Sequence, residues 1–397
     1  MRSNTALTPV DVGRGLRMAH EFHVGRAQRL TDNPPLVAAC RLAEYLLPVY
    51  DWDPTVPIGP HRAAFLLASL ASLQRDLRAR GSDLLFRMQP PDKQVQHLYR
   101  QAETLYNVDD LPMPLERLPG VFTSFRRDLE KSATQWRAPL PAPPKLPALP
   151  PGVSCPDVPT PGELGIETLE ADDRSAFPFH RPEFAPSETA AQTHLRQYLE
   201  TRRVDSYKAT RNGLIGTEFS SKFSPWLSLG IISARTIAEA VREYEREHGS
   251  NDGTYWLWFE LVWRDFFAFR AMTEVSAAQT KEPRNANAPF RVWCQGATGC
   301  RFVDAAMIEL ARTGWMSNRM RQIAASYLIH ELRCPWQWGE WWFATHLVDY
   351  DPASNEGNWR YIAGQGADPR GGRRFSIEHQ QQSYDPQHTY SRYWLGQ

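Results

Sequence analysis

Ten of the chain's 32 prolines lie between Pro139 and Pro161, and this run limits the possible folds more than any other feature. Proline lacks a backbone N–H and fixes φ, so the segment suits neither a helix interior nor a central strand. We expect a semi-rigid linker over residues 136–175 that separates two domains, at residues 1–135 and 176–397. A chain of 397 residues is also long enough to form two domains.

The part before the linker has the pattern of a small α/β layer. An apolar run of strand type begins at Tyr45, a helix with leucines at three- and four-residue spacing follows up to Gly81, and residues 84–86 form a second apolar run. Strand, helix and strand in this order predict parallel strands joined by a crossover helix. No glycine-rich loop follows the first of these strands, so a Rossmann-type dinucleotide site is not supported.

The part after the linker is expected to be all-helical, which makes the fold class mainly α. Ser187 and Ser233 each precede an amphipathic segment and are placed to cap it, and Ser224 with Pro225 is expected to start and cap a third helix. Residues 254–271 are apolar almost all round, which predicts a central helix.

Composition excludes several classes of protein. The 45 basic and 45 acidic residues balance, so any nucleic-acid surface must be a local patch. The five cysteines are scattered without a CxxC pair, which argues against a metal site or a disulfide framework. No run of 18 apolar residues and no leader-like segment occurs. We expect a cytoplasmic monomer that binds neither metal nor membrane.

The segment from Gly314 to Trp359 combines six tryptophans with charged and amide side chains. Aliphatic residues build ordinary cores, because each buried indole N–H or charge needs its own partner. The composition therefore indicates a pocket for a flat ligand with polar edges. The alternative is an aromatic-rich helical core with surface charges.

Four segments of the C-terminal half resemble the photolyase/cryptochrome family, most closely its DASH-type cryptochromes: TRNGLIGTEFSSKFSPWLSLG, YWLWFELVWRDFF, TGWMSNRMRQIAAS and DYDPASNEGNWRYIAGQGADPR. The resemblance covers residues 175–395, and pieces of the N-terminal half match as well, among them LLPVYDWDP and LPGVFTSFRRDLE. Between LLFRM and TLYNVDD this chain has only a short bridge where the family has a further strand–helix–strand stretch. The resemblance therefore implies a truncated antenna domain, and we expect no antenna pigment.

The resemblance implies that the helical domain holds FAD. In SSKFS, the hydroxyl groups, the lysine and the free N–H groups at a helix start also favour an anion on physical grounds. The cofactor-binding residues implied are Tyr207, Ser220, Ser221, Lys222, Phe223, Ser224, Glu260, Arg264, Asn318, Arg321, Asp349, Asp351 and Asn355. Asn318 and Arg321 lie three apart and can reach the same ligand edge, and Asn355 matches the residue that faces flavin N5. Without the resemblance, Arg321 and Asp349 would read as a plain salt bridge.

A lesion pocket is implied by the same resemblance. A cyclobutane pyrimidine dimer must leave the base stack, rest against aromatic faces and be hydrogen-bonded at its carbonyls. If Glu260 is buried there, desolvation favours its protonated form, which can donate. Glu260 and Trp263 could instead be core residues on one helix face. The catalytic residues implied are Glu260, Trp263, Asn318, Gln322, Asn355 and Tyr361; the absence of histidine at Asn318 and Gln322 argues against (6-4) repair.

Candidate phosphate contacts for a DNA strand are Lys222, Arg264, Arg319, Arg373 and Arg374, with a solvated surface as the ordinary alternative. For electron transfer to the flavin, Trp359 matches the family's proximal tryptophan and Trp336 the middle one. No tryptophan stands at the third, exposed position, where Trp338, Trp341, Trp342 or a tyrosine could substitute.

We therefore expect an FAD-dependent, blue-light-driven deoxyribodipyrimidine photolyase, a carbon–carbon lyase that splits cyclobutane pyrimidine dimers in DNA, with single-stranded DNA favoured. The main alternative is a cryptochrome-type blue-light photoreceptor without repair activity. A flavin-binding remnant that cannot be photoreduced is a third hypothesis.

Overall fold

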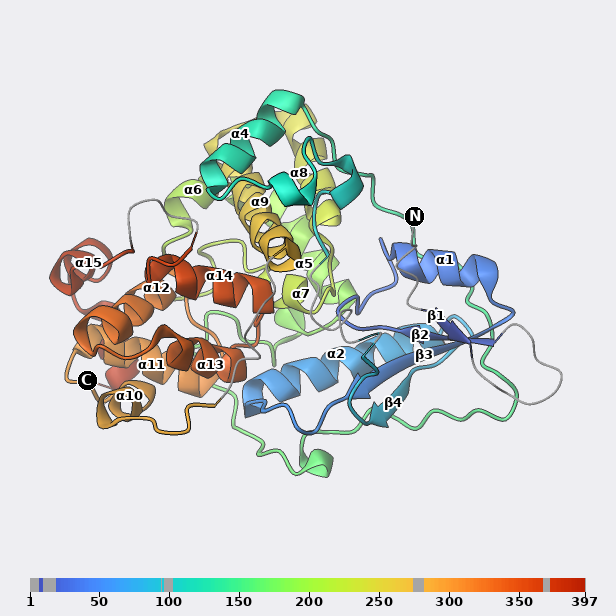
Figure 1. Ribbon diagram of the computed structural model, residues 1–397, viewed down its shortest axis with the longest axis horizontal. Coiled ribbons are helices and arrows are strands. Elements are labelled where there is room, and N and C mark those ends of the chain that lie inside the picture. The colour runs from blue at the N-terminus through green and yellow to red at the C-terminus, as the bar shows by residue number, and fades with distance from the viewer. Residues whose placement is uncertain are drawn as a thin grey trace.

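The protein has a small sheet layer beside a larger helical layer (Figure 1). The computed structural model describes residues 7–9, 19–93, 95, 103–273, 282–366 and 372–396, so the end of the fourth matching segment, 367–370, lies outside the described residues. The sheet has the order β1-β2-β3-β4, formed by Leu7–Pro9, Ala19–His23, Tyr45–Trp52 and Leu85–Met88. Strands β2, β3 and β4 are parallel, and β1 pairs with β2 in the antiparallel direction. The parallel unit predicted from Tyr45 onward is confirmed.

The two faces of the sheet are covered in different ways. Helices α1 (Pro34–Leu42) and α2 (Pro60–Arg78) are the crossovers, and the leucines of α2 pack on Leu46 and its even-numbered neighbours in β3. Leu47 and Val49 point to the opposite face, where they pack against Cys155 of the proline-rich segment. Ala148 of that segment also bridges to Tyr45. The proline-rich segment is therefore a cover for the sheet as well as a connection.

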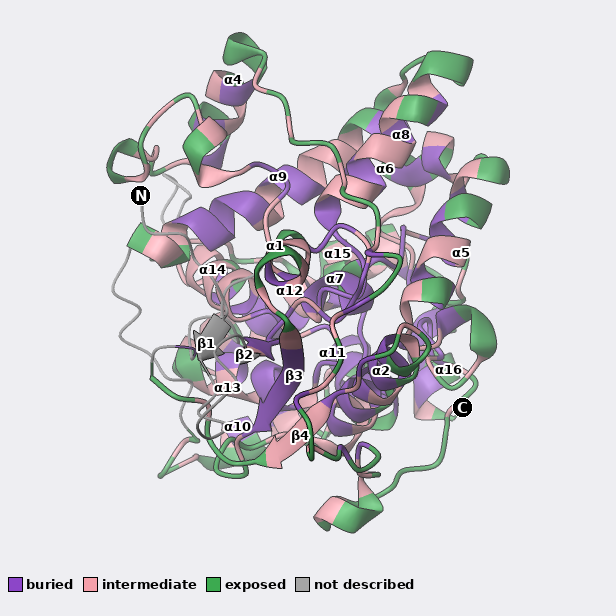
Figure 2. Ribbon diagram, turned by 90° about the vertical axis from the view of Figure 1, so that its right-hand side faces the viewer, coloured by how far each residue is buried: buried purple, intermediate pink, exposed green. Residues whose placement is uncertain are grey.

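The remainder of the described chain is helical, in agreement with the predicted class. Its helices are α4 (Phe122–Ser132), α5 (Glu188–Glu200), α6 (Tyr207–Thr210), α7 (Ser224–Ser228), α8 (Ala234–His248), α9 (Asp252–Thr273), α10 (Ala288–Cys294), α11 (Arg301–Thr313), α12 (Asn318–Ser326), α13 (Trp336–His346), α14 (Pro352–Ile362), α15 (Ile377–Tyr384) and α16 (Thr389–Leu395). Helix α9 is the central one, and much of its length is buried, as is that of β3 (Figure 2).

Two predicted helix caps are confirmed and one is wrong. Ser187 accepts a hydrogen bond from the N–H of Ala190 at 3.1 Å, and Ser233 from that of Thr236 at 2.9 Å. Ser224 is instead the first residue of α7 and makes no capping bond. Its hydroxyl donates to Asp349, 125 residues later in the chain, at 2.7 Å.

The chain leaves the sheet layer well before residue 135, the boundary that we expected for the α/β domain. In α4, the ring of Phe125 packs on Phe266 and Phe269 of α9, at centroid distances of 5.5 and 6.0 Å. Figure 1 likewise shows α4 beside α9, far from the sheet. Residues 122–132 therefore belong to the helical core.

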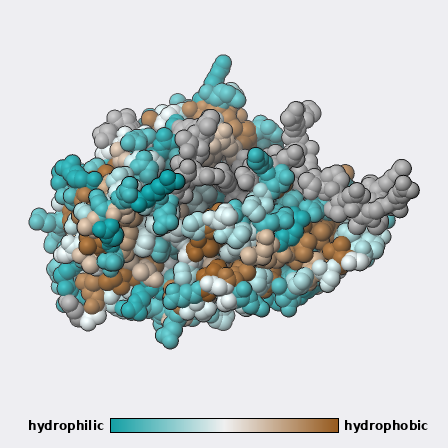
Figure 3. All heavy atoms as spheres, turned by 60° about the horizontal axis from the view of Figure 1, so that its bottom comes forward, coloured by the Kyte–Doolittle hydropathy of each residue, from teal (hydrophilic) through white to brown (hydrophobic). Residues whose placement is uncertain are grey.

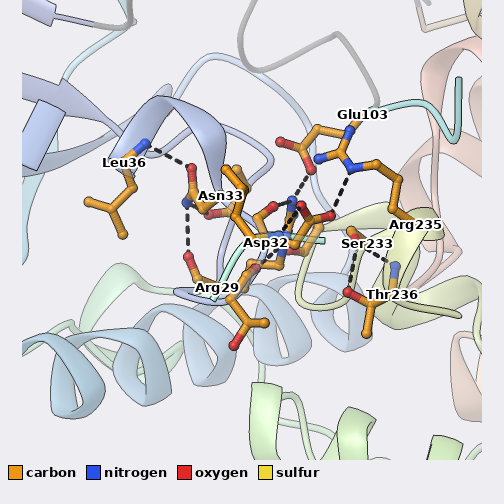
Figure 4. Close-up of polar contacts among 12 residues, drawn as sticks. Arg29, Asp32, Asn33, Leu36, Glu103, Ser233, Arg235 and Thr236 are labelled. Carbon is orange, nitrogen blue, oxygen red and sulfur yellow. Dashed lines mark hydrogen bonds and ion pairs between the residues drawn. The ribbon is translucent and has the colours of Figure 1, made fainter. Parts of the chain in front are cut away.

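Buried ion pairs join the two layers (Figure 4). Asp32, which has no exposed surface, accepts from Nε of Arg235 in α8 at 2.9 Å. Arg29 donates to the main-chain oxygen of Gly230 at 2.8 Å and pairs with Glu103. Removing one member would leave a buried charge unpaired, so these contacts hold the layers in a fixed relation.

No helix in the described ranges is long and apolar enough to cross a membrane. On the face shown in Figure 3, apolar residues form separate small groups among polar ones.

Candidate flavin and lesion site

Helices α12, α13 and α14 surround a hollow of about 580 Å³ that is partly open to solvent. Its lining includes Asn318, Arg321, Gln322, Asp349, Asp351, Asn355 and Trp359, all of them predicted site residues. The segment with the unusual mixture of tryptophans and polar groups thus forms much of a pocket wall.

Asp349 is held at the pocket wall through one of its two carboxylate oxygens. Its Oδ2 accepts from the Ser224 hydroxyl at 2.7 Å and from Nη2 of Arg321 at 2.9 Å. The other oxygen, Oδ1, is buried and has no hydrogen-bond partner among the described residues. A buried carboxylate oxygen without a donor is costly, so the pocket fits a ligand that brings an N–H or O–H group to this point, as the edge of FAD does.

Asn355 lies on α14, and its amide is oriented by the main chain of α13. Its Nδ2 donates to the carbonyl of Glu340 at 3.0 Å, and the residue is buried. This bond leaves Oδ1 as the group that can accept from a ligand. An amide oxygen suits the N–H of a reduced flavin N5, the role that the resemblance implies.

Asp351 connects the pocket to the sheet layer. Its Oδ1 caps α14 by accepting from the N–H of Ser354 at 2.7 Å, and its Oδ2 accepts from Arg26 at 2.5 Å. Burial alone would raise the pKa of Asp351, but the charges of Arg26 and Arg264 lower it to about 2. Sequence reasoning missed Arg26, which follows β2 and is distant in sequence from every other site residue.

The loop Ser220 to Ser224 forms a cradle for an anion. Ser220 and Lys222 have φ of 59° and 60°, and left-handed residues in alternation turn successive N–H groups toward one side. No hydrogen bond within the described ranges uses a main-chain N–H of this loop. The Tyr207 hydroxyl lies beside the side chains of Ser220 and Ser221. The loop therefore fits the diphosphate of FAD.

Two of the candidate DNA contacts lie inside the protein. Lys222 is 3% exposed, with Nζ over the rings of Phe219 and Trp315. Arg264 donates to the carbonyls of Glu103 and Leu227 between the two layers. These positions do not suit contacts with a DNA strand, so we retain only the other three arginines for that role.

The aromatic residues of the predicted lesion pocket lie together. The rings of Trp263 and Tyr361 have centroids 6.1 Å apart at 76°. Phe122 of α4 stacks on Trp263 at 3.7 Å. The stacked ring of Phe122 covers one face of the indole and so holds Trp263 in place beside Tyr361.

Glu260 differs from the expectation of a buried donor. Its side chain is 32% exposed and pairs with Arg211. An arginine partner favours the carboxylate, which accepts hydrogen bonds, over the acid that the expectation required. Arg211 was not predicted; its guanidinium also lies 4.8 Å from the ring centre of Trp256, and its place beside Glu260 makes it part of the same surface.

Of the three remaining arginines, Arg373 and Arg319 lie near this surface. Arg373 is 5.0 Å from the ring centre of Tyr361. Arg319 donates to Asn212 at 3.2 Å, and Arg374 pairs with Glu331 at 3.0 Å. Contact with Tyr361 makes Arg373 the strongest candidate for a phosphate beside the lesion.

A line of aromatic rings runs outward from the flavin pocket. Trp359 lines the pocket, and its ring lies 6.4 Å from buried Trp293. Phe290 then contacts Trp293 at 5.9 Å and the partly exposed Trp338 at 5.4 Å. Trp336 bonds to Gln365 through its indole N–H at 3.1 Å. Of the substitutes considered for the third tryptophan, Trp338 is the one joined to this line; Trp341 and Trp342 contact each other.

Comparison with known proteins agrees with this geometry. A family model described as the FAD binding domain of DNA photolyase matches residues 256–397, and one described as DNA photolyase matches residues 23–104. Cryptochrome DASH of Gloeobacter violaceus is 39% identical over 92% of this chain and 83% of its own length. That of Xenopus laevis is 37% identical over 92% of this chain and 80% of its own.

Solved structures give the same result. The cryptochrome of Synechocystis sp. has a TM-score of 0.82 at 35% identity, covering 94% of this chain and 88% of that one. A class III photolyase from Agrobacterium tumefaciens, at 24% identity and a TM-score of 0.77 over 98% of this chain and 88% of its own, supports the fold alone.

Fold and site define a flavoprotein of the photolyase type, with an FAD-binding helical domain. The chain belongs to the photolyase/cryptochrome family, in which it is similar to the DASH cryptochromes.

Proposed function

We propose that this protein repairs cyclobutane pyrimidine dimers in DNA by light-driven electron donation. The observation that carries the proposal is the aromatic pair Trp263 and Tyr361, because Tyr361 lies on α14, the helix that also supplies Asn355 and Trp359 to the pocket wall. A photoreceptor without repair activity needs the flavin pocket but not an aromatic platform with amide groups beside it.

Bound and reduced FAD supplies a light-excited electron. The chain's own residues do the rest: Trp263 and Tyr361 support an extruded dimer, and the amides of Asn318 and Gln322 donate to its carbonyls. Glu260, held by Arg211, accepts from a base N–H. Arg321 and Asp349 fix the flavin edge.

We further propose that single-stranded DNA is favoured, because extrusion of a dimer costs less without a complementary strand. Arg319, Arg373 and Arg374 would contact its phosphates. The protein would act as a cytoplasmic monomer. It would hold no antenna pigment, because between β4 and residue 104 the chain has only a short bridge where the family has a further strand–helix–strand stretch.

The test is reversal of a thymine dimer in single- and double-stranded oligonucleotides, with chemically reduced protein under blue light and in the dark. Light-dependent recovery of thymine absorbance, faster on the single strand, is expected. A Trp263→Ala, Tyr361→Ala double variant that keeps its FAD should lose this activity. No reversal by FAD-loaded, reduced wild type would favour the receptor.

A further inference from the structure

Lys222 is a buried amine without a hydrogen-bond acceptor. Its Nζ lies 3.1 Å from the ring centre of Phe219 and 4.4 Å from that of Trp315, and no described residue accepts a hydrogen bond from it. Contact with two aromatic faces stabilises an ammonium group by less than it costs to keep that group unpaired and out of water.

The groups around Lys222 do not supply a firm negative charge. Glu309 of α11 is fully buried; its Oε2 accepts from the Tyr390 hydroxyl at 2.5 Å, and its Oε1 has no partner among the described residues. Burial raises the pKa of Glu309 to about 8, so it is mostly protonated at neutral pH. The other charged or titratable groups that act on this pair are Glu218 of the same loop, already paired with Arg203 of the segment after α5, His194 of α5, Arg321 of α12 and Tyr390 of α16.

Burial holds the pKa of Lys222 well below its ordinary value. Burial also lowers the pKa of His194 to about 4, so this histidine is neutral. Lys222, Glu309 and His194, which lie behind the loop, are therefore mostly neutral until an anion binds.

Lys222 is also the middle residue of the anion cradle. Its left-handed backbone helps to turn the loop's N–H groups toward a diphosphate, while its side chain lies among the rings behind the loop. A bound diphosphate would lie close to Lys222 with little water between them. At low dielectric such a charge stabilises the ammonium form strongly.

We propose that FAD binding is coupled to proton uptake by Lys222, which is neutral in the empty protein and becomes an ammonium when the diphosphate occupies the cradle. The inference goes beyond the repair proposal and does not depend on it, since it concerns FAD binding in the dark.

The sign of the pH dependence follows from linkage. The FAD-loaded protein binds the proton more tightly than the empty protein does. FAD affinity is therefore greatest at pH values below the pKa of Lys222 in the empty protein. It then falls as the pH rises toward the pKa of Lys222 in the loaded protein, by at most about tenfold per pH unit.

The experiment is calorimetric titration of the apoprotein with FAD in two buffers of different ionisation enthalpy, from pH 6.5 to 9. Uptake of about one proton per FAD is expected for the wild type. Lys222→Met, which keeps the apolar stem in the ring cage, should take up almost none and bind FAD about 10- to 100-fold more weakly. Lys208→Met, which removes an exposed lysine paired with Asp252, should behave as wild type.

Zero uptake by the wild type would overturn the proposal, as would equal uptake by Lys222→Met. If Glu309 passes its proton to Lys222 when FAD binds, the wild type takes up no proton from solution, whereas the Glu309→Gln variant takes up one. The wild-type measurement alone decides if the Lys222 variant does not fold.

Discussion

The sheet layer and the helical layer differ in how their buried charged groups are paired. At the carboxyl end of the sheet, His23 lies 3.2 Å from Asp51 and 3.4 Å from Glu21, while Arg87 bonds to both acids at 2.7 and 2.9 Å. Two acids and two bases thus neutralise one another. In the helical layer, Asp349 keeps one oxygen and Lys222 its ammonium nitrogen without a partner in the described ranges.

This difference separates a scaffold from a ligand site. A closed set of charges stabilises the fold without a further molecule, whereas unmatched buried groups are costly until a ligand satisfies them. The proline-rich segment covers Leu47 and Val49, and the paired charges satisfy the polar end of the same face. We infer that light absorption and chemistry are both confined to the helical layer.

The largest expected effect is that of Asp349→Asn. It removes a charge that Arg321 and Ser224 share, and breaking such a buried pair costs about 3–5 kcal/mol. FAD affinity should fall about 100-fold or more, measured as flavin retained per protein. Asp51→Asn in the sheet layer is the matched change, and we expect it to lower stability but to leave FAD per folded protein unchanged. Loss of flavin from the Asp51→Asn variant would contradict the view that the sheet layer is a scaffold and only the helical layer holds the ligand.

The second prediction concerns alkaline pH and His23. Burial opposes its charge, but hydrogen bonds and charges from Asp51 and Glu21 raise the pKa of His23 to about 9. This contribution to stability, about 2–3 kcal/mol, is complete below pH about 6.5 and is lost as pH rises through about 9. Hydrogen exchange at β3 should therefore accelerate more than at α9 between pH 6.5 and 9.5. A His23→Gln variant should not show this difference, and equal acceleration in both layers of the wild type would argue against it.

Glu260→Ala tests the lesion side of the helical layer. Loss of the acceptor held by Arg211 should reduce repair about 10- to 100-fold with little loss of FAD. Repair rate and flavin content are measured on the same preparation. Asp252→Ala, which removes an exposed acid from the same helix, should leave both unchanged. Release of FAD on substitution of Glu260 would assign it to the cofactor instead.

The smallest expected effect is that of Trp338→Phe. The substitution removes the outer tryptophan of the line through Phe290 and Trp293 to Trp359. Photoreduction of bound FAD should slow several-fold, while repair by chemically reduced protein stays the same. Trp342→Phe, which changes a tryptophan stacked on His346, is the control. If Trp342→Phe slows photoreduction and Trp338→Phe does not, the outer residue has been misassigned.

Local sequence patterns predicted many of the elements, whereas the family resemblance implied most residues of the pocket wall. The caps at Ser187 and Ser233 and the central helix α9 follow from spacing along the chain. The spacing of Asn318 and Arg321 likewise placed them on one side of α12, and both line the hollow.

The remainder depends on contacts between distant segments. Ser224 reads as a cap, yet its hydroxyl serves Asp349, because tertiary packing brings a better acceptor to it. Arg26 meets Asp351 only because the residues after β2 press against Gly230, whose φ of +66° and missing side chain allow the approach. The pairing of Arg211 with Glu260 and the burial of Lys222 have no local signal either.

An action spectrum would test whether the helical layer alone both absorbs the light and uses it. Dimer repair by chemically reduced, FAD-loaded protein as purified from its native host would be measured across the near-ultraviolet and blue. The expected spectrum follows the absorption of protein-bound reduced FAD. An additional band with no counterpart in that absorption would show a second pigment, and light absorption would then not be confined to the helical layer.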